Sequence, residues 1–140
     1  MKQVFLTSLF LLLTLTACKG SAEEITGRQV SVTGGSYKNI NPAELNTMLS
    51  NMDFLLINVH IPFTGNIQDT DLSIAYDQIS APENLAQLPV DKNAKIVLYC
   101  RSGRMSEIAA AELVSLGYTY IWNLEGGMVA WEQAGHEIEK

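Results

Sequence analysis

The most constraining feature of the sequence is an apolar run that ends at a cysteine and leads into a helical segment. Ile96–Tyr99 is apolar without alternation, which is typical of a strand covered on both faces. Cys100 follows directly, and a short segment of small, polar and cationic residues separates it from Glu107–Leu113, which predicts a helix. The sequence therefore predicts a strand–loop–helix unit with a thiol where the strand ends.

The loop after this cysteine is suited to hold an anion. Its backbone N–H groups can converge on one point, and the N-terminus of the following helix adds a partial positive charge. Arg101 and Arg104 add two full positive charges. Each of these effects favours the thiolate of Cys100 over the thiol. Such a nucleophile is suited to attack sulfur or another soft electrophile.

The other elements alternate between strands and helices along the chain. We expect further strands at 37–40, 53–59, 73–76 and 118–122, and helices at 42–49, 81–88, 107–116 and 128–134. This alternation predicts an α/β fold in which a parallel sheet carries helices on both faces. Ligands of such sheets bind outside the carboxyl ends of the strands, where Cys100 is placed.

Two details of this pattern can be tested directly in a structure. Residues 61–72 are expected to form a long loop. The helix after Cys100 is expected to bury an apolar face made of residues at helical spacing, namely Ile108, Ala109, Leu113 and Leu116.

The N-terminus has the pattern of an export signal. Lys2 precedes an apolar stretch at residues 4–17, which is too short to span a membrane as a helix. It ends in Leu15–Cys18, which resembles the lipobox of bacterial lipoproteins. The resemblance implies that residues 1–17 are cleaved and that Cys18 becomes a lipidated N-terminus. An ordinary signal peptide or an uncleaved anchor is the alternative.

Lipidation would attach the protein to a membrane surface in the bacterial cell envelope, facing the periplasm or the exterior. Residues 18–36 are then expected to be a tether, in which 28–32 could form a short strand. A single globular domain would occupy 37–140, which is long enough to bury a core without disulfides.

Charge and cysteine content exclude several classes of function. The formal net charge is −6, and no basic stripe lies outside the loop, so we expect no nucleic-acid partner. The only cysteines are Cys18 and Cys100, without a Cys-x-x-Cys or Cys/His cluster, so we expect no metal site. A disulfide between these two cysteines is an open alternative to separate roles. The sequence indicates no cofactor and gives no oligomeric state.

Two motifs resemble a known family. Cys100–Ser106 closely resembles the active-site loop of the rhodanese family of sulfurtransferases. Asn123–Trp131, with a Gly-Gly turn followed by Trp, resembles the second signature of the same family. The two motifs have the order and spacing of the family, and the resemblance covers roughly 37–138. It implies a rhodanese-like α/β fold with a central, mostly parallel sheet of about five strands and helices on both faces.

The resemblance also implies an activity. Cys100 would be the catalytic nucleophile, taking a sulfane sulfur from a small sulfur-anion donor such as thiosulfate and passing it, from a persulfide, to a thiol or cyanide. The rest of the loop would bind the substrate and the persulfide, through Arg101, Ser102, Gly103, Arg104, Met105 and Ser106. No cofactor is implied.

The chain departs from the family pattern after the second expected strand. Asn58-Val59-His60 stands where rhodanese domains typically carry Asp-Val-Arg, and Gly65-Asn66-Ile67 stands where they carry Gly-His-Ile. His60 is either a structural histidine at a strand end or a general base, which needs hydrogen-bond reach to the chemistry.

Two other functions are open at this point. Phosphate or arsenate chemistry occurs on the same fold, but it requires an arginine six positions after the cysteine, where this chain has Ser106. A membrane-tethered, non-enzymatic sulfur-carrier or binding module is the second, and the altered Asn58–His60 segment favours it.

Overall fold

The computed structural model describes residues 24–140. The expected signal peptide, the expected lipidation site Cys18 and the first part of the expected tether lie outside these residues. Among the described helices, none combines the length and the apolar character that a membrane span requires.

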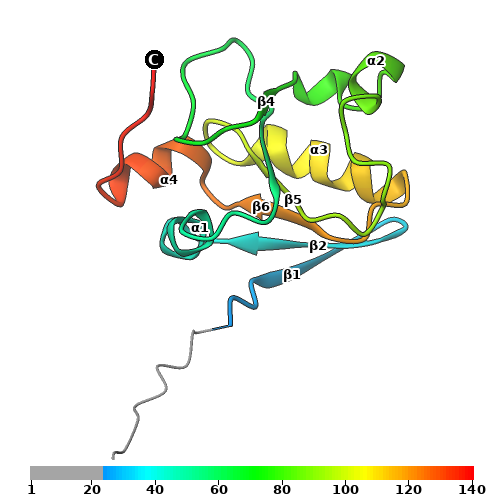
Figure 1. Cartoon of the computed structure of the whole chain (residues 1–140), viewed down its shortest axis with the longest axis horizontal. Helices are drawn as coiled ribbons and strands as arrows, with labels where there is room; N and C mark the ends of the chain where they lie inside the picture. Colours follow the sequence, from blue (N-terminus) through cyan, green and yellow to red (C-terminus); the bar gives the residue numbers. More distant parts are fainter. Residues whose placement is uncertain (1–23) are drawn as a thin grey trace, which may run out of the picture.

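The described chain forms one sheet with helices packed against it (Figure 1). The strands are β1 (Arg28–Val32), β2 (Gly35–Ile40), β3 (Leu55–Asn58), β4 (Leu72–Ser73), β5 (Ile96–Tyr99) and β6 (Ile121–Leu124). The helices are α1 (Pro42–Leu49), α2 (Pro82–Leu85), α3 (Arg104–Ser115) and α4 (Gly127–Gln133), with a short 3-10 helix, η1, at Tyr76–Gln78. The strand order is β1-β2-β6-β5-β3-β4, and β1–β2 is the antiparallel pair. The predicted α/β class and mostly parallel sheet are confirmed, with six strands rather than about five.

The additional strand comes from the segment expected to be a tether. Arg28–Val32 pairs with β2 in a hairpin whose register places Val30 opposite Tyr37. Gly34, with φ of 91°, makes the turn in a region of backbone conformation that favours glycine. Arg28 also reaches Glu125, with 2.6 Å between Nη2 and Oε1. Residues 28–36 therefore belong to the folded domain.

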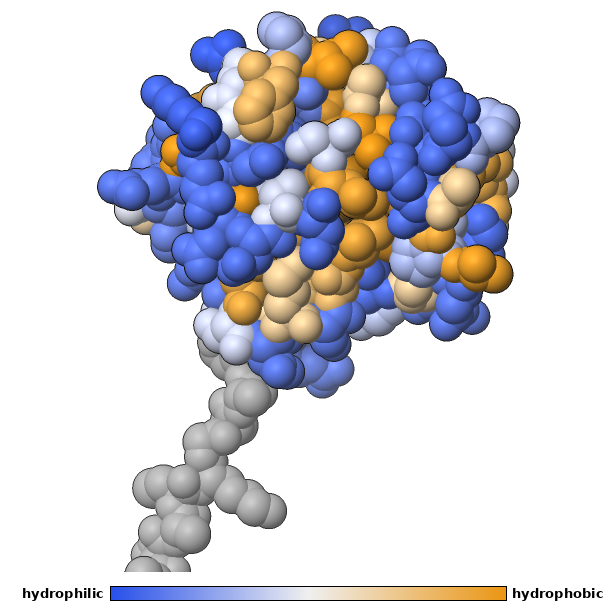
Figure 2. All heavy atoms as spheres, turned by 45° about the horizontal axis from the view of Figure 1, so that its top comes forward, coloured by the Kyte–Doolittle hydropathy of each residue, from blue (hydrophilic) through white to orange (hydrophobic). Residues whose placement is uncertain are grey.

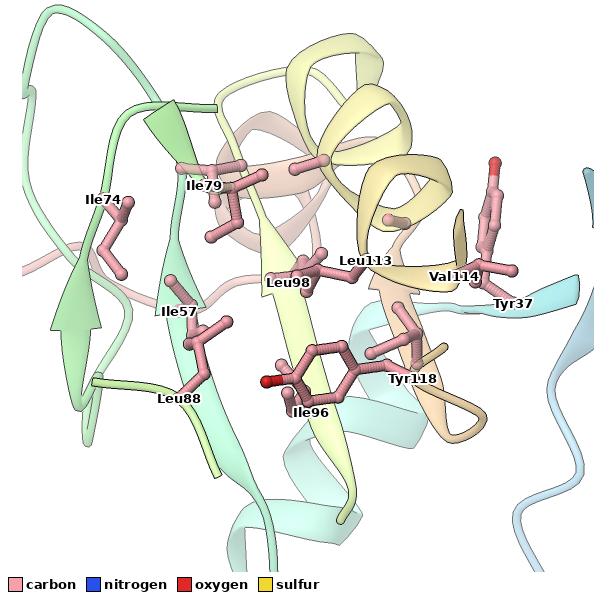
Figure 3. Packing of buried hydrophobic residues seen from close by; sticks show 14 of the residues in the cluster. Tyr37, Ile57, Ile74, Ile79, Leu88, Ile96, Leu98, Leu113, Val114 and Tyr118 are labelled. Atoms are coloured by element: carbon pink, nitrogen blue, oxygen red, sulfur yellow. The ribbon is translucent and has the colours of Figure 1, made fainter. Parts of the chain in front are cut away.

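The central strand β5 supplies both faces of the core because successive side chains point to opposite sides of a sheet. Ile96, Leu98 and Cys100 pack on the side of α3, where Figure 3 shows Leu98 close to Leu113 of the helix. Val97 and Tyr99 pack on the other side, with residues of α1 and α4. All five residues from Ile96 to Cys100 are buried. Helices therefore cover both faces, as predicted.

The long loop after β3 is held by a buried tyrosine of β5. The Tyr99 hydroxyl accepts a hydrogen bond from the Ile67 N–H at 2.9 Å and lies 2.7 Å from the hydroxyl of Thr70. Burial raises the pKa of Tyr99 above its ordinary value of 10.0, so the hydroxyl stays neutral and can both donate and accept. The loop that leaves β3 is thus attached to the strand that carries Cys100.

Two expectations for α3 and β6 are corrected. Ile108 and Leu116 are 46% and 37% exposed, although both were expected in the core. The buried stripe of α3 is instead made of Ser106, Ala109, Ala110, Leu113 and Val114. The last strand begins at Ile121 rather than at residue 118, because Tyr118 buries its ring against the core and donates its hydroxyl to the Pro89 carbonyl at 3.0 Å.

Candidate active site

The candidate site begins at the carboxyl end of β5, where the chain turns into α3. Val59 N–H donates to the Tyr99 carbonyl at 2.8 Å, so the end of β3 lies beside the end of β5. On the other side, the carbonyls of Cys100 and Arg101 each accept a bond of 2.9 Å, from the N–H groups of Met128 and Val129. The first residues of α4 therefore hold the loop in place.

The sulfur of Cys100 lies at the bottom of this loop and is enclosed. The residue is 1% exposed, and two donors point at its sulfur: the Gly103 N–H at 3.0 Å and the Ser106 hydroxyl at 3.4 Å. Gly103 adopts a φ of 106°, which turns its N–H back toward the sulfur and which other residues rarely adopt. Burial disfavours an anion on sulfur, whereas these two donors stabilise one.

The start of α3 adds backbone donors directly after the loop. The helix begins at Arg104, and the N–H groups of its first turn have no carbonyl four residues before them within the helix. Arg101 and Arg104 are exposed, and neither forms an ion pair with any described residue. The loop therefore offers both backbone dipoles and two free cations to an anionic substrate.

A pocket of about 240 Å³ opens over the thiol. It is lined by His60, Tyr76, Cys100, Arg101, Ser102, Arg104, Met105 and Ile108. Figure 2 shows apolar surface gathered in a band on the face that comes forward when the top of Figure 1 is tilted to the viewer. Exposed apolar residues next to the pocket lining include Ile61, and Ile108 belongs to the lining itself.

The structure places the predicted site residues in two layers. Arg101, Ser102, Arg104 and Met105 line the pocket, where a substrate would lie. Gly103 and Ser106 are buried beneath it and contact the sulfur. The Ser106 hydroxyl also lies 2.9 Å from the Gly103 carbonyl, and its single hydrogen can go to either acceptor, so the hydroxyl braces the loop when it does not donate to the sulfur.

Three lining residues come from outside the loop: the sequence left His60 open as a structural histidine or a general base, and it did not place Tyr76 or Ile108 at the site. His60 follows β3, Tyr76 opens η1, and Ile108 lies one turn into α3. A usable signal existed for His60, because the ends of adjacent parallel strands meet at one edge of the sheet. For Tyr76 no local signal exists, because it reaches the pocket through the path of the long loop after β3.

Asn58 arranges the backbone before and after His60. Its amide nitrogen donates to the Gly65 carbonyl and to Asn66 Oδ1, both at 2.9 Å, and its oxygen accepts from the His60 N–H at 2.9 Å. The neutral amide therefore closes the loop with hydrogen bonds of both kinds. This is the structural role of the residue that stands where the family pattern has an aspartate.

Comparison with known proteins now adds the family. The family model described as "Rhodanese-like domain" matches residues 56–134, more than half of the 140 residues. The chain belongs to the rhodanese-like domain family. The match contains both the Cys100 loop and the Gly126–Gly127 turn that supports it.

Individual relatives agree with this family. A sulfurtransferase of Allochromatium vinosum is 36% identical over 89 residues, covering 61% of this chain and 78% of that protein. A tRNA uridine(34) hydroxylase of Escherichia coli is 29% identical over 107 residues, or 74% of this chain, but the chain spans only 30% of that protein. The crystal structure of a rhodanese-like domain protein from Staphylococcus aureus is 29% identical with a TM-score of 0.58, covering 74% of this chain and 99% of that one.

Proposed function

We propose that this protein is a sulfurtransferase that carries a sulfane sulfur on Cys100. The observation that carries the proposal is the position of the Cys100 sulfur, which receives the Gly103 N–H at 3.0 Å beneath a pocket that Arg101 and Arg104 line. The similarity to a sulfurtransferase over most of that protein's length supports the same reaction class.

The first half-reaction loads the cysteine. The Cys100 thiolate attacks the outer sulfur of a donor such as thiosulfate, the sulfur–sulfur bond of the donor breaks, and sulfite leaves with the electron pair. Arg101 and Arg104 attract the anionic donor, and they stand in the pocket rather than in ion pairs. The new outer sulfur of the persulfide extends into the pocket, toward the first N–H groups of α3.

The second half-reaction removes the added sulfur from Cys100. An acceptor thiolate or cyanide attacks the outer sulfur, and the electron pair of the persulfide bond returns to Cys100. The sulfur of the released thiolate again accepts from Gly103 N–H and from the Ser106 hydroxyl. The covalent intermediate makes two-step kinetics the expected pattern.

Phosphoryl transfer is less compatible with this site. On this fold that chemistry uses an arginine at the end of the loop, which binds two oxygens of the phosphoryl group. Here the residue at that point is Ser106, which is buried and directs its hydroxyl to the cysteine sulfur. The loop is therefore built around one sulfur atom.

The experiment measures the mass of the purified protein after treatment with thiosulfate. We expect a gain of about 32 Da, the mass of one sulfur atom, on the peptide that contains Cys100 and on no other. The loaded protein is then mixed with cyanide or with a thiol, and turnover is followed. Absence of the added mass would overturn the proposal, and loading without turnover would identify a sulfur carrier instead of an enzyme.

We also propose that the mature chain is attached to a membrane of the bacterial cell envelope through a lipid on Cys18. The proposal rests on the sequence of residues 1–18, with its basic start, short apolar core and small residues before the cysteine. Incorporation of a labelled fatty acid in a bacterial host tests it. Labelling that persists in Cys18→Ala would contradict it.

A further inference from the structure

The pocket above Cys100 contains a histidine whose ring nitrogens have no hydrogen-bond partner among residues 24–140. His60 lines this pocket together with Cys100. Its Nδ1 is buried and has no hydrogen-bond partner among the described residues, whereas Nε2 is not enclosed. Nε2 is therefore the ring nitrogen that a molecule in the pocket can reach.

The backbone around His60 is fixed from three directions. The residue's own N–H donates to Asn58 Oδ1 at 2.9 Å. The preceding residue, Val59, donates to the Tyr99 carbonyl at 2.8 Å and accepts from the Tyr76 N–H at 3.1 Å. The backbone that carries the imidazole is therefore fixed relative to the strand that ends in Cys100.

The surroundings keep this imidazole neutral. Burial, followed by the nearby Arg101 guanidinium, lowers the pKa of His60 below its ordinary value of 6.5. The titratable and charged groups that share the pocket are Tyr76, Cys100, Arg101 and Arg104, and no carboxylate of the described residues is among those that line it. At neutral pH, His60 therefore has a free lone pair rather than a charge.

A neutral proton acceptor can act on the acceptor molecule in the second half of the proposed reaction. Thiosulfate arrives without a proton to lose. An alkyl thiol acceptor has a pKa of about 8.5, so only about 3% of it is the reactive thiolate at pH 7. Removing this proton inside the pocket could therefore accelerate the transfer by up to roughly 30-fold.

We infer that His60 is the general base that deprotonates a thiol acceptor. This inference rests on the proposed sulfurtransferase function. The acceptor S–H bond breaks and its proton goes to Nε2 of His60, whose lone pair is free when the ring proton is on Nδ1. The sulfur of the acceptor forms a bond to the outer sulfur of the persulfide, the persulfide bond breaks, and its electron pair returns to Cys100. No oxidant is needed, because one sulfane sulfur changes place. Burial and the Arg101 guanidinium disfavour the imidazolium, so the proton is passed on to solvent.

The test isolates the second half-reaction with two acceptors. Cys100 is loaded from thiosulfate, excess donor is removed, and loss of the added sulfur is timed by mass spectrometry. One acceptor is an alkyl thiol, and the other is an aromatic thiol that is already ionised at pH 7. We expect His60→Gln to lower the rate of sulfur transfer to the alkyl thiol by about 10-fold at pH 7. The rate of transfer to the aromatic thiol should change less than 2-fold.

The pH dependence gives a second, independent measurement. Above pH 9 most of the alkyl thiol is ionised without a base. The rate of sulfur transfer to it should therefore be the same in His60→Gln as in the native protein. As the pH falls through the lowered pKa of His60, the imidazole becomes protonated and the advantage of the native residue is lost as well. The rate difference between His60→Gln and the native protein should therefore be largest near neutral pH.

The matched control is the other histidine. His136 stacks on Trp131, with 4.1 Å between ring centroids, and lies outside the Cys100 pocket. His136→Gln should leave the ratio of the two acceptor rates unchanged. If His60→Gln slows both acceptors equally, or neither, His60 is not the base. If no sulfur can be loaded onto the native protein, the sulfurtransferase proposal itself has failed, which is a different result.

Discussion

Cys100→Ser should abolish sulfur transfer, with a loss of at least about 1000-fold in rate. A serine hydroxyl is not ionised at neutral pH and is a poor nucleophile toward sulfur, so no persulfide equivalent can form. The remaining site is unchanged, because the hydroxyl can accept the Gly103 N–H that now points at sulfur from 3.0 Å. The measurement is the thiosulfate-dependent gain of mass together with turnover to cyanide.

The stability of this variant separates a chemical from a structural effect. Because serine is close to cysteine in size and keeps a hydrogen-bond acceptor, we expect the free energy of unfolding to change by no more than about 1 kcal/mol. Thermal unfolding followed by circular dichroism checks this. A variant that is folded and fully active would show that the mechanism is wrong.

Gly127→Ala should disrupt the site through its packing, with a loss of roughly 3 kcal/mol or more in the free energy of unfolding. A methyl group on Gly127 would overlap the Cys100 carbonyl oxygen and lie 2.8 Å from the Arg101 carbonyl carbon. Both neighbours are backbone atoms that cannot move without displacing the catalytic loop. We therefore expect loading of Cys100 with sulfur to fall along with the melting temperature.

Gly117→Ala is the matched control for this substitution. Gly117 also has a positive φ, of 92°, but nothing lies within 4 Å of the position that a methyl group would take. The Gly117→Ala variant therefore measures the backbone strain alone, which we expect to lower the free energy of unfolding by about 1 kcal/mol. Equal losses in the two variants would contradict the proposed contact between the Gly126–Gly127 turn and the Cys100 loop.

The sequence was sufficient to predict the elements that lie in the middle of the fold. The uninterrupted apolar run Ile96–Tyr99 predicted the buried central strand, and it is buried on both faces. The Asn41-Pro42 pair predicted the start of α1, where the Asn41 side chain accepts from the Glu44 N–H at 2.9 Å. Both signals depend only on residues that are neighbours in the chain, so they can be recognised in the sequence without knowledge of the fold.

The remaining features depend on contacts between distant segments. Arg28–Val32 forms a strand because it pairs with the edge of β2. Its own sequence is compatible with a strand but does not require one. Ile108 has the helical spacing of a core residue, but the pocket occupies the space beside it, so it stays 46% exposed. The enclosure of Cys100 likewise follows from α4, through the bonds from Met128 and Val129 to its loop.

The last residues of the chain connect both walls of the pocket. Glu139 exchanges two backbone hydrogen bonds of 2.8 Å with Asn66, in the loop that follows His60, while the start of α4 holds the Cys100 loop. The loop that follows His60 is thus held by a segment that lies outside the sheet. Loss of this bridge would free that loop while the strands themselves were still paired, so the position of His60 beside Cys100 is a more fragile property of this domain than its folded state.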